Sequence, residues 1–513
     1  MHLVDTDLVI YEYDLHTDFP DAVIKQAEEA AAIPVASGSP ECSEISGGCR
    51  DLRGWQIITI DGEDARDRDD AVSLKLTADG NYCLGVHIAD VSRYVKEGSR
   101  LDREAFARGT SVYFPDRVLP MLPEILSNGV CSLNPGEDRY ALSCLMTIDK
   151  RGRVVKHSLF PSVINSKAAL SYDFVNKVLA GEAQSEFAVL LNNLNSLRSR
   201  LLKKRRKRGS VFFDFPEADI IMEETGEVAE VRKHLSGAGE SIIEEAMIVA
   251  NETVASLFRD RDLPFIYRIH ELPEDDSILE MHDAVNALGY SLSKQRGSLK
   301  PYHIQKLLKK AECTRDYYLL QRLILLTLKH AAYATENCGH FGLASRCYCH
   351  FTSPIRRYPD LWVHRLIRYC FFKDDNKEEN KDGKGKTGNL LKTLETAAEQ
   401  STVMECITED AEREAAEYKK CRYLARYIGS EFDGFISGVV RGGFFVELDN
   451  TIEGMVSVSD LPKDEYKFHE HTRTLQGKTG GLCFHPGDKV RVKVEHVSVE
   501  DRRNYFVFVG FGE

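Results

Sequence analysis

Short runs of β-forming residues mark the chain between residues 51 and 165. Each run is rich in Val, Ile, Leu and aromatic residues, and turns rich in Asp and Gly separate one run from the next. This arrangement is typical of strands joined by turns. The clearest runs are 55–60, 71–76 and 82–89.

A helical pattern replaces the strand pattern over residues 166–430. Apolar residues recur at helical spacing there, most regularly over 323–333 and 391–427. A short run at 211–213 still favours a strand. Residues 373–388 are charged, rich in Gly and almost without apolar residues, so we expect an exposed insertion at this point.

Strand signals return at the end of the chain. From residue 429, four or five short runs alternate and break at Gly, which suits a small closed barrel. Residues 1–50 form a lead-in, with a helical pattern over 23–32 and a Ser-, Gly- and Pro-rich linker over 36–49. The pattern therefore predicts an α+β chain, with a large mixed domain over 51–428 and a barrel domain over 429–513.

Length and composition limit the class of protein. A chain of 513 residues is too long for one small core, so two or more domains are expected. No apolar run reaches the length that spans a bilayer, and the acidic segment from Met1 to Tyr13 does not resemble a signal peptide. The 13 cysteines follow no repeating frame, which favours reduced thiols in a cytoplasmic protein.

The formal net charge of −13 argues mildly against a nucleic-acid partner, because Lys and Arg drive phosphate binding. The location of the positive charge matters more than its total, however. An acidic exterior around a positive channel would focus a nucleic-acid strand into that channel.

The densest chemical feature lies at residues 61–70, directly after the first predicted strand. Six carboxylates occur in these ten residues. Like charges this close repel one another unless a positive partner neutralises them. Mg²⁺ does so with a few carboxylates, water and substrate phosphate. The cluster therefore indicates the metal site of a phosphodiesterase that uses two ions.

Other interpretations of the cluster compete with this one. A calcium loop of the EF-hand type needs Gly at its sixth position and Glu at its twelfth, but counting from Asp61 these positions are Arg66 and Val72. A nucleotide-binding loop would present glycines and backbone donors instead of carboxylates. A solvated acidic turn without a function stays open.

A second dense motif occurs at residues 350–361. It places Arg356 and Arg357 on a turn just before a helix that starts with Pro359. Two adjacent arginines can belong to an ordinary basic helix start, but a turn at this position can also present a guanidinium fork to phosphate. An acidic metal site elsewhere in the chain favours the phosphate interpretation, because its substrate needs a clamp of opposite charge.

A third feature is a run of six basic residues at 203–208, followed by Phe212 and Phe213. Such runs are usually solvated helix faces or localisation signals. The neighbouring aromatic residues also allow backbone contact followed by base stacking. Tyr113 is a similar candidate in a turn before Pro115, although core packing is the more common role of an aromatic residue.

Several segments in a fixed order carry a family resemblance. They are Thr59–Asp70, Val86–Ser92, Ile243–Met247, Tyr267–Glu271, Gly339–Ala344 and Phe351–Tyr358. Together they resemble the RNase II/RNase R (RNB) family, and within it the RNase R-like bacterial enzymes most closely. The match extends over nearly the whole chain, and residues from 429 on resemble an RNA-binding S1-type OB domain.

The resemblance implies a fold and a reaction. The fold is an RNB catalytic domain, in which a mixed sheet and many helices surround a central RNA channel. The reaction is processive, Mg²⁺-dependent hydrolysis of single-stranded RNA from its 3′ end, which releases nucleoside 5′-monophosphates during RNA turnover. Two metal ions are implied, for which Mn²⁺ can substitute. The partner is RNA, and the protein is expected to be monomeric and without contact to a membrane.

The resemblance also assigns catalytic roles by position. Asp61 and Asp70 are expected to hold metal most directly. Asp69 is expected to matter most for the chemical step, and Asp67 completes the metal-binding set. Arg356 matches the arginine that binds phosphate near the metals.

Further residues match the RNA-binding positions of the family. Tyr113 corresponds to a tyrosine that stacks on a terminal base, and Phe213 to the aromatic residue that closes the stack from the other side. Arg357 adds a second guanidinium beside Arg356. Glu412 resembles a family glutamate near the site.

The resemblance has limits and leaves one alternative. The sequence begins after the position at which two cold-shock-type OB domains usually end in the family. It also stops before the Lys-rich tail of many RNase R-like enzymes. For these two reasons, the resemblance does not imply substrate capture or duplex unwinding by this chain. The alternative function is a catalytically inactive or truncated RNB-like scaffold that binds RNA. Inactive members would lack some of the aspartates or the arginine, and here all are present.

Overall fold

The computed structural model describes most of the chain. The described residues are 5–35, 49–213, 215–292, 299–372, 383–470 and 472–512. The predicted linker at 36–49, apart from its last residue, and the predicted insertion at 373–388, apart from the backbone of its last six residues, lie outside them. Within the described ranges, no helix has both the length and the apolar character needed to cross a membrane.

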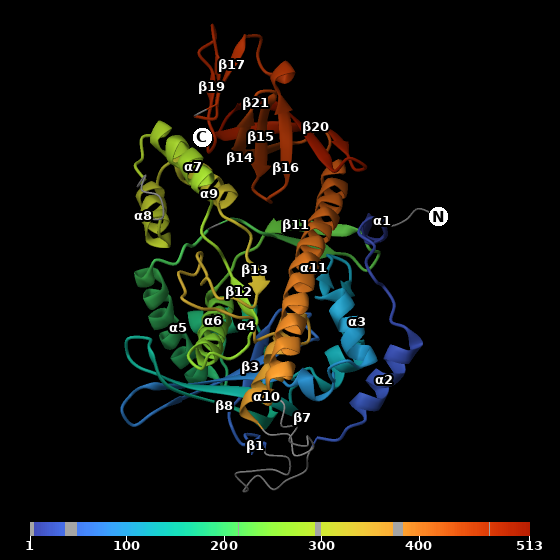
Figure 1. The fold of residues 1–513 in the computed structure, drawn as a ribbon. Coiled ribbons are helices and arrows are strands. Elements are labelled where there is room, and N and C mark those ends of the chain that lie inside the picture. Colours follow the sequence, from blue (N-terminus) through green and yellow to red (C-terminus); the bar gives the residue numbers. More distant parts are fainter. Residues whose placement is uncertain are drawn as a thin grey trace.

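A seven-stranded mixed sheet forms the centre of the larger domain (Figure 1). Its order is β1-β8-β7-β4-β3-β2-β9. Its strands are β1 (Arg50–Asp51), β2 (Ile58–Asp61), β3 (Asp70–Leu76), β4 (Tyr82–Ala89), β7 (Asp138–Ile148), β8 (Val154–Asn165) and β9 (Ala168–Ser171). The runs predicted at 71–76 and 82–89 are confirmed as β3 and β4, and the run at 55–60 is β2 shifted toward Asp61.

The chain also forms helices, several of which cover this sheet. In chain order they are α1 (Asp5–Glu12), α2 (Asp21–Ala31), η1 (Val91–Arg93), α3 (Arg100–Arg108), η2 (Ile125–Val130), α4 (Tyr172–Ala180), α5 (Ala188–Arg208), α6 (Ala238–Arg259), α7 (Asp275–Ala287), α8 (Pro301–Ala311), α9 (Asp316–Thr327), α10 (Tyr358–Phe371) and α11 (Gly383–Ala425). Helix α5 packs on β3, and α6 packs on β2 and β4, so the middle of the sheet is shielded from solvent.

Three two-stranded ribbons complete the larger domain. They are β5 (Val112–Tyr113) with β6 (Val118–Leu119), β10 (Ala218–Met222) with β11 (Val228–Lys233), and β12 (Tyr267–Ile269) with β13 (Ala332–Ala334). Two sequence predictions are wrong here. Residues 211–213 form no strand, because the Val211 amide donates to the Gly342 carbonyl in a loop contact. The helix predicted over 323–333 ends at Thr327, and the chain then enters β13.

The predicted closed barrel at the end of the chain is confirmed. Its strands are β14 (Glu431–Val440), β15 (Gly443–Leu448), β16 (Glu453–Ser457), β21 (Arg503–Phe511) and β20 (Lys489–Ser498), in that order. The insertion between β16 and β20 contains η3 (Val458–Asp460) and a small sheet of β17 (Tyr466–His469), β18 (Thr474–Gly477) and β19 (Cys483–Phe484). Helix α11 runs through the molecule and ends below the barrel (Figure 1).

A buried ion pair ties the central sheet to α10. Asp90 directly follows β4 and is 1% exposed. It accepts hydrogen bonds from the guanidinium of Arg368 on α10 and lies 3.6 Å from Arg93. Although burial acts to raise the pKa of Asp90, the two guanidiniums hold this pKa well below its usual value. The pair matters for the site because the turn that carries Arg356 leads directly into α10.

Replacing this carboxylate should destabilise the fold. We expect Asp90→Asn to lower the free energy of unfolding at pH 7 by about 3–5 kcal/mol, since it leaves Arg368 buried without its counter-charge. Because the folded pKa of Asp90 is depressed, its contribution is complete above about pH 4 and is lost as the pH falls toward the folded pKa. Urea denaturation of both proteins should therefore show a difference that shrinks below about pH 4. The exposed Asp262→Asn is the matched control; an equal effect of the two substitutions would contradict the account.

Candidate functional site

The acidic cluster lies where two neighbouring strands of the sheet meet a loop. Strand β2 ends at Asp61 and β3 begins at Asp70, and the two strands are antiparallel neighbours. The loop between them is held in place by Ser132, whose hydroxyl donates to the Arg66 carbonyl at 2.6 Å and accepts from the Arg68 amide at 3.1 Å. The sheet and this loop therefore fix the aspartates at one edge.

A hydrogen bond joins the acidic cluster to the second motif. The Ile355 amide donates to Asp69 Oδ1 at 2.8 Å, although the two residues are 286 positions apart in the sequence. The other oxygen, Oδ2, lies 4.0 Å from Nε of Arg356. The two motifs that the sequence singled out separately thus form one site.

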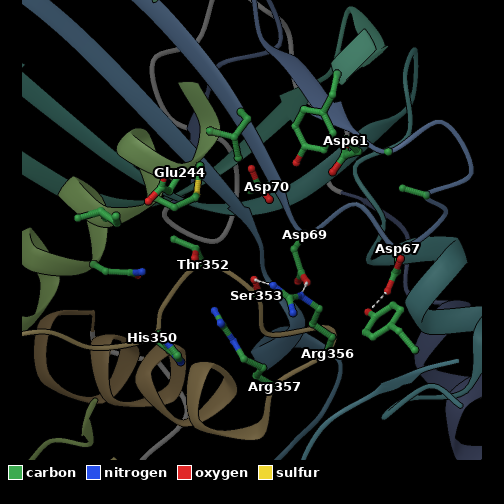
Figure 2. A pocket seen from close by; sticks show the side chains of 18 of the residues that line it. Asp61, Asp67, Asp69, Asp70, Glu244, His350, Thr352, Ser353, Arg356 and Arg357 are labelled. Carbon is green, nitrogen blue, oxygen red and sulfur yellow. Dashed lines mark hydrogen bonds and ion pairs between the residues drawn. The ribbon is translucent and has the colours of Figure 1, made fainter. Parts of the chain in front are cut away.

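A cavity of about 550 Å³ opens between the two motifs. One part of its lining is acidic: Asp61, Asp67, Asp69 and Asp70. Another part comes from the second motif, with His350, Thr352, Ser353, Arg356 and Arg357. Figure 2 shows the carboxylates of Asp61, Asp69 and Asp70 and the guanidinium of Arg356 around this one cavity. The predicted catalytic residues are therefore brought together.

The carboxylates in the cavity lack partners for part of their oxygen atoms. Oδ2 of Asp61, Asp69 and Asp70 is buried and accepts no hydrogen bond from a described residue. Burial raises the pKa of all three, and mutual repulsion with Asp61 raises that of Asp70 further. Oδ2 of Asp61 lies 3.9 Å from Nε of Arg68. Oδ2 of Asp69 lies 4.0 Å from Nε of Arg356, whereas Asp70 forms no ion pair with a described residue. Buried carboxylate oxygens without hydrogen bonds are costly, so the arrangement fits a further bound positive charge.

The donor set fits a hard divalent cation. All candidate ligands are carboxylate oxygens, which Mg²⁺ and Mn²⁺ prefer, and the cavity leaves room for water and phosphate oxygens. As the side chains stand, no three His, Cys, Asp or Glu residues of the described chain are grouped closely enough to hold an ion by themselves. This agrees with an ion that also needs ligands from water and substrate.

Tyr113 stands at the edge of the cavity and is held from two sides. Its hydroxyl donates to Asp67 Oδ2 at 2.6 Å, and its backbone amide donates to Glu412 Oε1 at 2.6 Å. The Ser111 amide, two residues earlier, donates to the Arg356 carbonyl at 2.9 Å. Glu412 itself does not line the cavity, so its contact with the Tyr113 backbone is the role the structure shows. Tyr113 is 37% exposed.

The two adjacent arginines have different surroundings. Arg357 is buried and gives its fork to Asp360, with Nε and Nη2 3.0 and 2.9 Å from the two carboxylate oxygens. The side chain of Arg356 is 42% exposed and donates only one long hydrogen bond of 3.3 Å, to Ser353 Oγ, among the described residues. Arg356 is therefore the guanidinium that remains available to a phosphate.

Phe213 lies apart from this cavity. It does not belong to the cavity lining, and its ring stacks on Phe215 at 5.8 Å between centroids. Phe215 in turn contacts Tyr318 of α9, which packs on Phe435 of the barrel. The structure thus places Phe213 toward the barrel, and its predicted contact with RNA stays a prediction.

Tyr172 and Glu244 line the cavity but were not singled out as site residues from the sequence. Tyr172 follows Ser171, the residue that pairs with Asp61 in the parallel β2–β9 ladder, so this ladder brings its ring beside the cluster. Glu244 faces the cavity from α6 with a side chain that is 54% exposed. Glu244 belongs to a segment that carried the family resemblance, which was the available signal; Tyr172 had none, since only strand pairing places it.

Comparison with known proteins agrees with this geometry. The RNB domain family matches residues 49–373, and the S1 RNA binding domain family matches residues 427–506. Ribonuclease R 1 of Lactococcus lactis is 42% identical over 501 residues, which are 96% of this chain and 59% of that protein. Ribonuclease R of Thermotoga maritima is 42% identical over 505 residues, which are 96% of this chain and 68% of that protein.

A solved structure shares the fold over almost the whole chain. The structure of Mycoplasma genitalium RNase R in complex with ribose methylated single-stranded RNA matches with a TM-score of 0.88 at 29% identity, over 98% of this chain and 78% of that one. The chain spans 59% of the Lactococcus relative, so the match covers only part of that protein. With both motifs of its site in place and its domain matched over 49–373, the chain belongs to the RNB domain family.

Proposed function

We propose that this protein is a Mg²⁺-dependent exoribonuclease that degrades single-stranded RNA processively from the 3′ end to nucleoside 5′-monophosphates. The observation that carries the proposal is that Oδ2 of Asp61, Asp69 and Asp70 is buried without a hydrogen bond from a described residue, beside a cavity that Arg356 also lines. The Mycoplasma RNase R of similar fold binds single-stranded RNA, which supports RNA as the substrate. A cytoplasmic, monomeric protein and domain limits at 51–428 and 429–513 belong to the same proposal.

Each group of the site has a task in this reaction. Two divalent ions, when bound, lower the pKa of an attacking water and stabilise the leaving 3′ oxygen. Asp61 and Asp70 hold the ions, together with Asp67 and with Asp69, which the Ile355 amide orients. Arg356 binds the last phosphodiester with its free donors and offsets the charge that develops on it.

Tyr113 would position the terminal nucleotide. Its exposed ring offers a stacking surface, and stacking on an aromatic ring does not depend on the identity of the base. The hydrogen bonds to Asp67 and Glu412 hold the ring in one place at the edge of the cavity. The nucleotide would thus be fixed relative to the carboxylates while its phosphodiester is cut.

The scaffold alternative is less well supported. An inactive RNA-binding member has no need to keep four aspartates and an arginine around one cavity. Here Asp61, Asp69 and Asp70 each leave one oxygen buried without a hydrogen bond from a described residue, which costs stability that a scaffold would gain nothing from. The enzyme is therefore the better account.

Asp69→Asn tests the chemical step. We expect this change to lower monophosphate release from single-stranded RNA by about 10³-fold, the factor that about 4 kcal/mol of lost transition-state stabilisation gives. The side-chain amide keeps an oxygen that can accept from the Ile355 amide, so folding and RNA affinity should stay close to wild type. Release is measured by chromatography of the products, and affinity by filter binding. Undiminished release by a correctly folded variant would remove the proposal.

Metal dependence is a separate prediction. Chelation of divalent ions should abolish release, and added Mg²⁺ or Mn²⁺ should restore it, because both suit small sites of carboxylate oxygens. Thermal unfolding without RNA gives a second readout: Mn²⁺ should raise the melting temperature of the wild type, since a bound ion stabilises the folded state. Asp61→Asn/Asp70→Asn should lose this increase. Equal increases in both proteins would place the ion elsewhere.

Tyr113 can be tested through the end products. If its ring stacks on the terminal nucleotide, Tyr113→Ala should lengthen or alter the smallest fragment that remains after exhaustive digestion. Tyr113→Phe is the matched control, because it keeps the ring and removes only the hydrogen bond to Asp67. Its fragment ladder, resolved on a denaturing gel, should stay close to wild type. Identical ladders for all three proteins would assign Tyr113 to packing alone.

A further inference from the structure

A strongly basic surface lies outside the catalytic cavity. Helix α5 contains eight Lys and Arg residues and no Asp or Glu, in a chain whose net charge is −13. None of the six basic residues at 203–208 lines the catalytic cavity. The predicted contact of this run with an RNA backbone, if made, therefore lies outside that cavity.

The basic residues of α5 point in two directions. Its buried face carries leucines such as Leu194, Leu197 and Leu201, followed by Arg205, which is 6% exposed and donates to Glu244 and Glu245. The outward face carries a stripe of cations at helical spacing. The stripe consists of Arg200, Lys203, Lys204 and Lys207. Arg205 thus forms ion pairs inside the protein, whereas the residues of the stripe lie on the outer side of the helix.

The turn between β7 and β8 extends this stripe. Residues 149–157 contain four Lys and Arg residues, one His and a single Asp. The turn packs on the middle of α5, where Nη1 of Arg200 donates to the Lys150 carbonyl at 2.9 Å. A Cβ on Gly152 would come within 3.2 Å of the Arg200 carbonyl, so the contact is close. The helix and the turn therefore lie side by side on one flank of the molecule (Figure 1), which brings their basic residues near one another.

A small cavity lies within this surface. It measures about 330 Å³, and its basic lining residues are Arg153, Lys204 and His157; burial lowers the pKa of His157, so its imidazole is neutral at pH 7 and the positive charge comes from Arg153 and Lys204. Burial lowers the pKa of Lys204 from its usual value, and its ammonium forms no ion pair with a described residue. Glu252, the one acidic residue in the lining, lies 2.6 Å from Arg208. The cavity thus offers a poorly compensated ammonium to an incoming anion.

Helix α6 separates this cavity from the catalytic one. One stripe of α6 lines the catalytic cavity: Glu244, Met247, Ile248 and Asn251. A different stripe lines the outer cavity: Val249, Glu252, Thr253 and Ser256. The two sites therefore lie on different faces of the same helix, and the outer one has no direct contact with the cleavage chemistry.

We propose that the outer face of α5 and the β7–β8 turn, called here the outer basic surface, binds the phosphate backbone of RNA at a site separate from the catalytic cavity. One phosphate sits in the cavity of Lys204, and Arg200, Lys203 and Lys207 contact neighbouring phosphates. A dense array of Lys and Arg on an otherwise acidic protein is the electrostatic footprint of a nucleic-acid backbone. The inference rests on the proposed function only in taking RNA as the partner, and its test measures binding without cleavage.

The test compares RNAs of two lengths. In an Asp69→Asn background without divalent ions, Lys203→Gln/Lys207→Gln should weaken binding of an oligoadenylate of about 40 nucleotides by roughly tenfold, as expected for two exposed ion pairs. The slope of log affinity against log salt should become shallower by about 1.4, since each phosphate contact to single-stranded RNA contributes about 0.7. Binding of a pentaadenylate, which is too short to reach both sites, should not change.

The matched control removes the same charge elsewhere. Lys306→Gln/Lys309→Gln neutralises two exposed lysines of α8 and should leave both affinity and salt slope unchanged. Lys204→Met, which keeps the buried stem, should weaken only the long RNA. An unchanged salt slope in the α5 variant, or an equal loss in the α8 control, would overturn the proposal.

Discussion

The hydrogen bond from the Ile355 amide to Asp69 is the contact on which the site depends. It joins a loop of the central sheet to the turn before α10, and so brings Arg356 to the aspartates. The surrounding structure supports this joint from both sides. Ser132 holds the aspartate loop, and the buried pair of Asp90 with Arg368 anchors α10 to the sheet. A shift of either element would separate the carboxylates from their counter-charge.

The balance of positive and negative charge differs between three parts of this protein. Arg357 forms an ion pair with Asp360 through both Nε and Nη2, and Arg365 donates to the buried Asp102, so these charges inside the fold have partners of opposite sign. In the catalytic cavity, Asp61 has Arg68 at 3.9 Å and Asp70 forms no ion pair with a described residue, so negative charge is in excess there. On α5 the imbalance is reversed, and cations are left without anions. Both imbalances are complementary to parts of one RNA–metal complex.

The sequence predicted which residues carry the chemistry more fully than it predicted where those residues lie in space. Local patterns were enough for β3, β4, the barrel and the turn before Pro359, because each depends on residues close together in the chain. The position of Tyr172 beside the cavity depends on the pairing of β2 with β9. The conformation of the loop at 211–213 depends on a contact with Gly342. The division of the basic run into Arg205 inside and Lys203 outside follows from which face of α5 meets α6. Such long-range contacts leave no local signal.

The central claim is that the acidic edge of the sheet holds divalent metal beside the last phosphodiester. The most direct measurement is anomalous X-ray scattering from a crystal that contains Mn²⁺ and an RNA with a non-hydrolysable terminal linkage. The account predicts Mn²⁺ peaks bound to Asp61 and Asp70, with Arg356 on the adjoining phosphate. An RNA strand seated in the cavity with no metal between it and these carboxylates would contradict it.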